Sequence, residues 1–185
     1  VAVGSTDDIR PLIGPATHVV EGRGRTVIPG LIDTHVHALD VAATEAVQPY
    51  VNLGSIAEMQ AWLARQAASR PRDTWIWTPR VFPTRLRERR FPTRQELDAA
   101  APHHPVVVDG AYAFVLNTAA LTAAGITATT PDPAGGAIVR GAGGLPTGLL
   151  RNVGGLLNRF RPPSSGAVPL DGLEEVHRRY LAVGI

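Results

Sequence analysis

The feature that most constrains the fold is an alternation of capped helical segments with apolar runs over residues 55–126. Two helical segments begin with the pattern Ser/Thr-x-x-Glu, Ser55 with Glu58 and Thr93 with Glu96. In this pattern the side chains and backbone amides at a helix start satisfy one another's hydrogen bonds. The sequence therefore predicts helices over residues 55–68 and 94–101.

Apolar runs lie between these helices. "TWIWTPRVF" (74–82) and "PVVVDG" (105–110) are predicted strands. A third helix is predicted at "LNTAALTAAGI" (116–126), where Gly125 occupies the position favoured for a helix end. A Gly- and Pro-rich loop with a short β-hairpin (127–148) and two further helices (149–160 and 170–181) follow. Alternating strands and helices favour an α/β class.

The first part of the chain has a different pattern. Residues 1–28 alternate short apolar pairs with Gly and charge, which predicts short β segments joined by tight turns. Pro29-Gly30 interrupts that pattern, and "LIDTHVHAL" (31–39) reads as a strand. The chain opens on "VAVG", which reads as the middle of a strand, and closes on "YLAVGI", a helix that runs into the start of another strand, so we expect it to be part of a longer protein.

Composition excludes several function classes. Cysteine is absent, which removes disulfides and thiolate ligands, and with no secretory signal it makes the cytoplasm the default compartment. No run approaches the roughly 18 apolar residues of a membrane helix. All 18 basic residues are Arg, so no Lys can act as a ligand or a base. The net charge of +2 is too small to indicate nucleic-acid binding by itself.

The pair His35 and His37 is the strongest candidate for chemistry. In a strand, residues two apart project to the same side, so Asp33, His35 and His37 would share one face. Two imidazoles on one face can ligate one ion, and Asp33 could orient a ligating ring. The alternative is an ordinary histidine pair on a half-exposed strand. The H-x-H-x-D-H pattern of metallo-β-lactamase-like hydrolases fails, because Asp40 comes one position late.

Four ordered segments resemble one known family. They are "VVEGRGRTVIPGLIDTHVH", "TRQELDAAAPHHPVVV", "LNTAALTAAGIT" and "PDPAGGAIVRGAGGLPTGLL". Together they resemble the amidohydrolase superfamily, in its YtcJ-like (amidohydrolase 3) branch, over nearly the whole chain. The resemblance implies the N-terminal part of a distorted (β/α)8 TIM-like barrel. Residues 1–28 would form part of a small β-sandwich, 29–50 barrel strand one and its loop, 51–165 an α/β insertion, and 166–185 a barrel helix and the start of the next strand.

The resemblance also implies a metal-dependent hydrolase of amide or other non-peptide C–N bonds. His35 and His37 match the family's strand-one ligands for one or two divalent ions, taken here as zinc, and the substrate would be a small molecule. The remaining ligands and the catalytic Asp come from later strands that this chain does not contain. His18, His103, His104 and His177 do not replace them by motif. We therefore expect no catalytic residue in this chain, weak metal affinity and little or no activity.

One segment departs from the family. Many relatives carry a His after "D-G", where this chain has Ala111 and Tyr112. Tyr112 could line a substrate pocket or lie in the core.

Two other functions stay open at this point. A non-catalytic protein for interaction or assembly is one. An anion or nucleic-acid binder built on the Arg-rich loop, residues 85–94, is the other, although a solvated loop fits the small net charge better. Unpaired strand edges would also favour a homo-oligomer.

Overall fold

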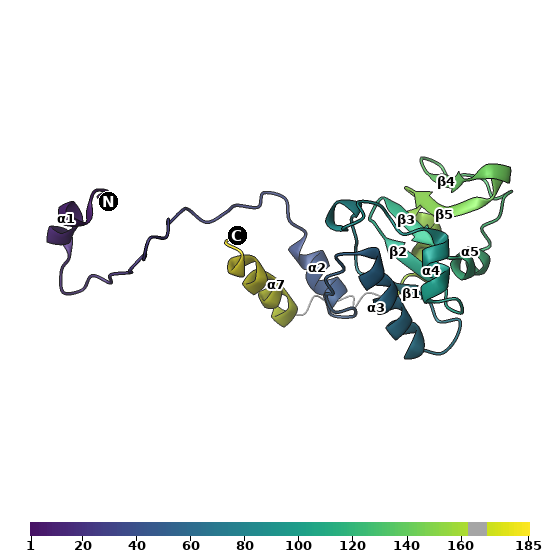
Figure 1. Cartoon of the computed structure of the whole chain (residues 1–185), viewed down its shortest axis with the longest axis horizontal. Helices are drawn as coiled ribbons and strands as arrows, with labels where there is room; N and C mark the ends of the chain where they lie inside the picture. Colours follow the sequence, from purple (N-terminus) through teal and green to yellow (C-terminus); the bar gives the residue numbers. More distant parts are fainter. Residues whose placement is uncertain (163–169) are drawn as a thin grey trace. The chain divides into compact units, whose positions relative to one another are not determined.

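The computed structural model describes residues 1–162 and 170–185 (Figure 1). It divides into two units, one of residues 1–36 with 178–185 and one of residues 37–177. The predicted boundary between residues 165 and 166 lies outside the described residues. Within the described ranges, no helix is both long and apolar enough to cross a bilayer.

A five-stranded mixed sheet organises the unit of residues 37–177. The strand order is β1-β2-β3-β5-β4, with β1 parallel to β2 and the other neighbours antiparallel. The strands are β1 Ile76–Trp77, β2 Val106–Asp109, β3 Ala113–Leu116, β4 Ala137–Arg140 and β5 Pro146–Arg151. The fold is therefore mixed α/β, as the sequence predicted.

Each face of the sheet has its own apolar core, because successive side chains of a strand point to opposite sides. Val106 and Val108 of β2 pack with α3 (Ile56–Ala68) and α4 (Arg94–Ala100). Val107 packs on the other face with residues of α5 (Thr118–Ala124) and α6 (Gly154–Leu157). The centre of β2 is buried on both faces, which explains its uninterrupted Val-Val-Val run.

The predicted helix caps are present. The Ser55 hydroxyl accepts the Glu58 N–H, and Thr93 and Glu96 form a complete capping box. Gly125 ends α5 in the left-handed conformation, with φ of 69°.

Asn117 is a fully buried cap at the start of α5. Its Oδ1 accepts the N–H groups of Val106 and Ala120, while its Nδ2 donates to the carbonyls of Ala101 and His104. One side chain thus joins β2, the end of α4 and α5. A buried amide is stable when its donors and acceptors are satisfied in this way.

Two predicted elements differ from the structure, and one strand was not predicted. Only Ile76–Trp77 of the run 74–82 is a strand. The chain from 149 to 160 is not one helix: 149–151 extend β5, and α6 and the 3-10 helix η4 (Asn158–Phe160) follow. Strand β3 was missed. Backbone pairing decides these cases, since Leu149 and Leu150 lie opposite residues of β3.

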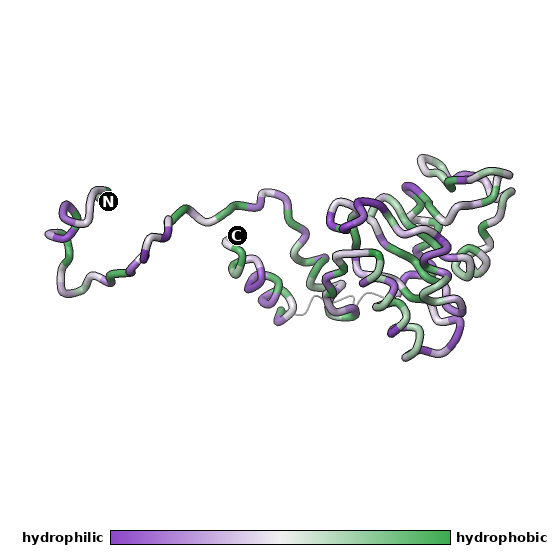
Figure 2. Tube along the Cα trace, viewed as in Figure 1, coloured by the Kyte–Doolittle hydropathy of each residue, from purple (hydrophilic) through white to green (hydrophobic). Residues whose placement is uncertain are grey.

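The prediction of β segments in residues 1–28 is wrong for this chain. The segment contains α1 (Thr6–Ile9) and the 3-10 helix η1 (Arg10–Leu12), and no strand. None of residues 1–36 is buried, although apolar stretches recur along them (Figure 2). A strand requires a hydrogen-bonded neighbour, and no described strand pairs with this segment. Membership of a β-sandwich domain stays a prediction.

The last long helix agrees with the prediction. It is α7, Leu170–Ala182, against a predicted 170–181. Val176 is its buried residue and His177 is exposed.

Candidate functional site

The histidine segment does not adopt the predicted strand. Residues 31–37 are irregular with a bend, and α2 (Ala38–Glu45) begins directly after His37. The Asp33 carboxylate accepts the backbone N–H of His35 at 3.0 Å. This Asx-type turn satisfies the amide locally, where a barrel strand would pair it with a neighbour. The strand prediction for 31–39 is therefore wrong here, because no described strand lies beside the segment.

The two histidines have different surroundings. His35 belongs to the unit of residues 1–36, and His37 is the first residue of the unit 37–177. Both are exposed. The His37 Nδ1 lies 3.5 Å from Asp40 Oδ2, an exposed pair three residues apart at the start of α2. Asp33 contacts the backbone of His35 and Asp40 contacts the ring of His37.

The donor set can be tested against a metal site. Imidazole nitrogens suit Zn²⁺, and both rings are accessible. Within residues 1–162 and 170–185, however, no three His, Asp or Glu side chains converge in a way that could hold an ion. Catalytic zinc sites have three protein ligands and a water. The two histidines are suitable zinc ligands by type, but a catalytic site requires one more protein ligand than the described residues bring together.

Within the described residues, the other four histidines do not join a metal-binding group. His104 is buried, and its Nε2 lies 3.1 Å from the Pro71 carbonyl oxygen, a contact that ties two loops together. His18, His103 and His177 are exposed and come from three separate parts of the sequence. A structural or surface role was predicted for each, and for His104 the structural role is confirmed.

Tyr112 is 78% exposed and does not lie in the core. Its backbone carbonyl accepts the Asn152 N–H at 2.7 Å, which anchors the turn after β2 to the end of β5. Ala111 before it has φ of 68° in the left-handed region. A role in substrate binding stays a prediction for the Tyr112 side chain.

Asp109, at the end of β2, lies at the centre of a charged cluster that was not predicted from the sequence. It is buried, its Oδ2 accepts from Arg161 Nη1 at 3.0 Å, and Arg80 Nε lies 3.9 Å from its Oδ1. The Arg161 guanidinium also covers the Trp77 ring at 4.5 Å. The "D-G" motif was interpreted only as a turn. A charged residue ending a buried Val run was the available signal, because such a carboxylate needs partners.

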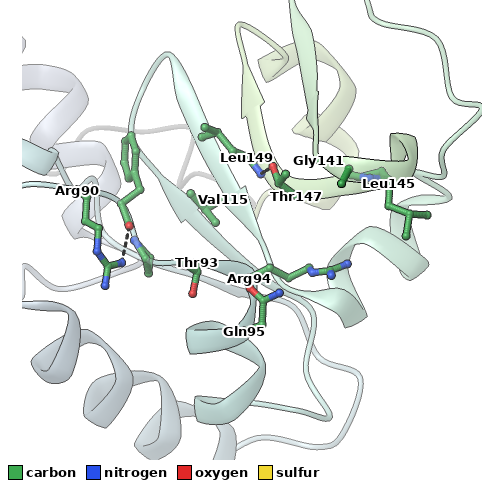
Figure 3. A pocket seen from close by; sticks show the side chains of 13 residues that line it. Arg90, Thr93, Arg94, Gln95, Val115, Gly141, Leu145, Thr147 and Leu149 are labelled. Atoms are coloured by element: carbon green, nitrogen blue, oxygen red, sulfur yellow. Dashed lines mark hydrogen bonds between the residues drawn. The ribbon is translucent and has the colours of Figure 1, made fainter.

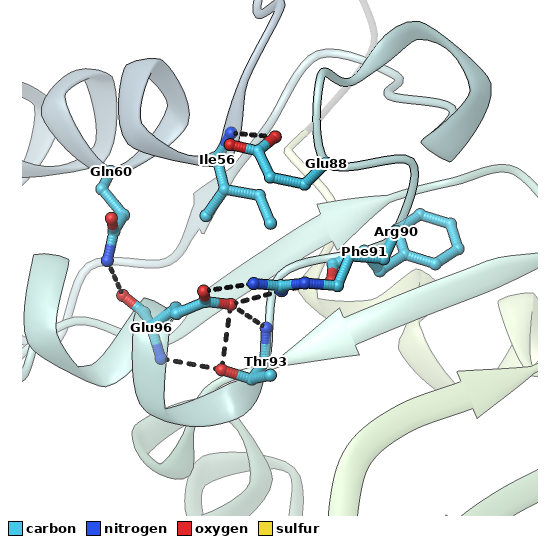
Figure 4. A network of polar contacts seen from close by, with 7 residues as sticks. All are labelled: Ile56, Gln60, Glu88, Arg90, Phe91, Thr93 and Glu96. Carbon is cyan, nitrogen blue, oxygen red and sulfur yellow. Dashed lines mark hydrogen bonds and ion pairs between the residues drawn. The ribbon is translucent and has the colours of Figure 1, made fainter.

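Several charged residues of the Arg-rich loop have partners within the chain, although their side chains are exposed (Figure 4). Arg90 donates to both carboxylate oxygens of Glu96, at 2.7 and 2.8 Å. This bidentate pair, with the Thr93 hydrogen bonds, lowers the pKa of Glu96 to about 2. Glu88 accepts the Ile56 N–H at the start of α3.

Two more arginines of the loop have local partners. Arg89 Nη1 donates to the Thr84 carbonyl, and Arg85 lies over the Phe82 ring. These contacts stay within or next to the loop, whereas Glu88 joins it to α3 and Arg90 joins it to α4. Together they leave fewer guanidinium groups for an anionic polymer.

Comparison with known proteins shows the family of the chain. Residues 18–185 match the amidohydrolase family. The chain belongs to this family. N-substituted formamide deformylase from Arthrobacter pascens is 36% identical over 156 residues, which are 80% of this chain and 28% of that protein. YtcJ from Bacillus subtilis is 31% identical over 154 residues, again 80% of this chain and 28% of that protein.

The chain thus spans about 28% of the length of these curated relatives. Among solved structures, an uncharacterized metal-dependent hydrolase from Pyrococcus furiosus aligns with 85% of this chain and 30% of its own, at 15% identity and a TM-score of 0.42. That likeness is too low to support an inference. The predicted superfamily and YtcJ-like branch are confirmed by the sequence matches.

Proposed function

We propose that this chain is the N-terminal, metal-binding part of an amidohydrolase that cleaves amide or other non-peptide C–N bonds in small molecules. His35 and His37 would supply two ligands of the metal site. The supporting observation is the family match over residues 18–185, which includes the His-x-His pair. A bound divalent ion, taken as zinc, would activate water and polarise the scissile carbonyl.

The fold proposed for the complete protein is a distorted (β/α)8 barrel. Residues 31–37 would become its first strand once neighbouring strands supply the backbone partners that the described residues lack. Asp33 would then exchange its local hydrogen bond to His35 for a contact within the barrel. The unit of residues 37–177 would carry the α/β insertion. This rearrangement would put Asp33, His35 and His37 on one face.

The residues of this chain have binding and orienting roles in the proposal. His35 and His37 would hold the ion through ring nitrogens, and Asp40 could accept a hydrogen bond from His37 Nδ1 and so leave Nε2 as the ligating atom. Neither histidine transfers a proton to the substrate. The general base and the remaining ligands come from residues outside this chain.

The substrate class follows one of the relatives by analogy. That relative is named as a deformylase of N-substituted formamides. We propose N-substituted formamides as the first substrates to test, with a longer protein that also contains the remaining barrel strands.

The test uses zinc titration of the 185-residue chain by calorimetry. We expect weak binding that is lost in both His35→Ala and His37→Ala. His103→Ala is the matched control, since His103 is exposed and distant in sequence, and it should bind as the wild type does. Binding that survives both substitutions would refute the ligand assignment.

The activity arm uses an N-substituted formamide with the same chain. Because only two ligands are present, we expect no hydrolysis with zinc. Hydrolysis abolished by His35→Ala would show that the chain is a complete enzyme and would overturn the proposed division of the site.

A further inference from the structure

A groove on the unit of residues 37–177 has no role in the proposed metal site. Its volume is about 550 Å³, within the range of roughly 300–1,000 Å³ of small-molecule sites. It lies between the segment 90–95, which leads into α4, and the tip of the β4–β5 hairpin (Figure 3). His35, His37 and Tyr112 do not line it.

Most of the groove wall is apolar. Val115, Pro146 and Leu149 come from the sheet, and Phe91, Pro92 and Leu145 come from the two flanking loops. Leu145 is 60% exposed at the hairpin tip. An aliphatic or aromatic group placed here would remove apolar surface from water on both sides, which is favourable.

The charge in the groove has one sign. Its lining contains Arg90 and Arg94 and no Asp or Glu. Arg90 is neutralised by the bidentate contact with Glu96. Arg94 has no ion pair within the described part of the chain, and its Nε is buried without a hydrogen-bond partner. An arginine that lines an apolar groove without a counter-charge favours an anionic ligand, which would contact its terminal Nη groups because the Nε is closed to solvent.

The position of Arg94 is fixed by a glycine of β5. A Cβ at Gly148 would lie 3.1 Å from Arg94 Cβ and 2.4 Å from the Leu116 carbonyl oxygen. The bare glycine lets the Arg94 stem pack against the strand. In Figure 3 the Arg94 side chain extends toward the hairpin residues Gly141 and Leu145. Its planar fork suits a carboxylate, which it can bind with two parallel hydrogen bonds.

We propose that this groove binds a small molecule with an apolar body and one carboxylate, and that Arg94 receives the carboxylate. The apolar body would lie against Leu145 and Leu149. This site goes beyond the proposed hydrolase function, because it requires neither the metal nor the residues of the histidine segment.

The first experiment titrates the isotope-labelled 185-residue chain with hexanoate and with 4-phenylbutyrate, followed by amide NMR shifts in EDTA-containing buffer. EDTA removes metal from the histidine pair, so failure here would not bear on the proposed hydrolase. We expect saturable shifts at Gly141, Thr147 and Leu149. The neutral match 1-hexanol should bind at least about tenfold more weakly, because it forms no charge-assisted hydrogen bond with Arg94.

The second experiment uses variants. Arg94→Gln should weaken hexanoate about tenfold. Arg87→Gln, an exposed arginine of the same loop outside the groove, should leave binding unchanged. Leu145→Ser should weaken both the acid and the alcohol.

Three results would overturn the proposal. One is the lack of saturable shifts at the groove with either acid. Another is equal hexanoate affinity in the wild type and Arg94→Gln. The last is self-association of the chain that Arg94→Gln abolishes, measured by sedimentation, which would identify a second copy as the occupant.

Discussion

Residues 1–36 and residues 37–177 both carry many apolar side chains, yet only the second region buries them. Val27 and Ile32 are 91% and 86% exposed, whereas Leu63 and Leu97 are completely buried. The second region contains five strands that pair with one another and helices that cover both faces of the sheet. The first contains no strand, and its backbone contact with a distant part of the chain is the hydrogen bond from the Leu31 N–H to the Gly184 carbonyl. Apolar content therefore does not produce a core without pairing partners.

The largest expected effect tests the core directly. Leu97→Ala should lower the free energy of unfolding by about 2–5 kcal/mol, because it leaves a cavity between α4 and the sheet. Ile32→Ala is the matched control and should change it by less than about 0.5 kcal/mol. Urea unfolding followed by tryptophan fluorescence measures both. An equal loss in the control would show that residues 1–36 are packed in solution.

A smaller effect is expected from glycine substitution. Gly148→Ala should cost about 1–3 kcal/mol, since Gly148 has φ of +98° and a Cβ would meet the Leu116 carbonyl. Gly155→Ala, in α6 where an added Cβ would meet open space, should be neutral or should stabilise by up to about 1 kcal/mol. Thermal unfolding compares the two. A neutral Gly148→Ala would contradict the tight contact between β3 and β5.

The smallest effect concerns the Arg90–Glu96 pair and depends on pH. The pKa of Glu96 is lowered from 4.5 to about 2, mainly by Arg90. A carboxyl group with a lowered folded-state pKa stabilises the fold above its unfolded pKa, and this stabilisation is lost as the pH falls from about 4.5 toward 2. Arg90 is half-exposed and solvent screens the pair, so we expect about 1–1.5 kcal/mol at pH 7.

Glu96→Gln should remove this contribution and flatten the acid limb of the stability curve. Glu21→Gln, in the exposed first region, is the control and should leave the curve unchanged. Urea midpoints between about pH 7 and pH 2.5 measure the effect. An unchanged acid limb in Glu96→Gln would show that the pair is broken in solution.

Local signals in the sequence predicted the capped helices well. The pattern of Thr93 with Glu96 and the terminal Gly125 are satisfied within a few residues, so they do not depend on the rest of the fold. The buried Val-Val-Val run also predicted β2. Strand β3 and the extension of β5 over residues 149–151 were missed, because their conformation depends on partners far along the chain.

The candidate metal site shows the same limit. The sequence identified His35 and His37 by type, spacing and family resemblance. Their predicted common face required a strand, and in this chain the Asp33 carboxylate closes a turn on His35 instead. The Asp109 cluster was missed for the opposite reason, since Arg80 and Arg161 meet it only through the fold.

The sequence by itself determined the family, the α/β class and the positions of the capped helices α3, α4 and α5, because motifs and caps are encoded by neighbouring residues. The tertiary structure alone decided which apolar segments became strands, which groove-lining arginine stayed without a counter-charge, and where the groove formed. Backbone pairing and ion pairing join residues distant in sequence. Their outcome depends on which partners are present, and local chemistry cannot specify that.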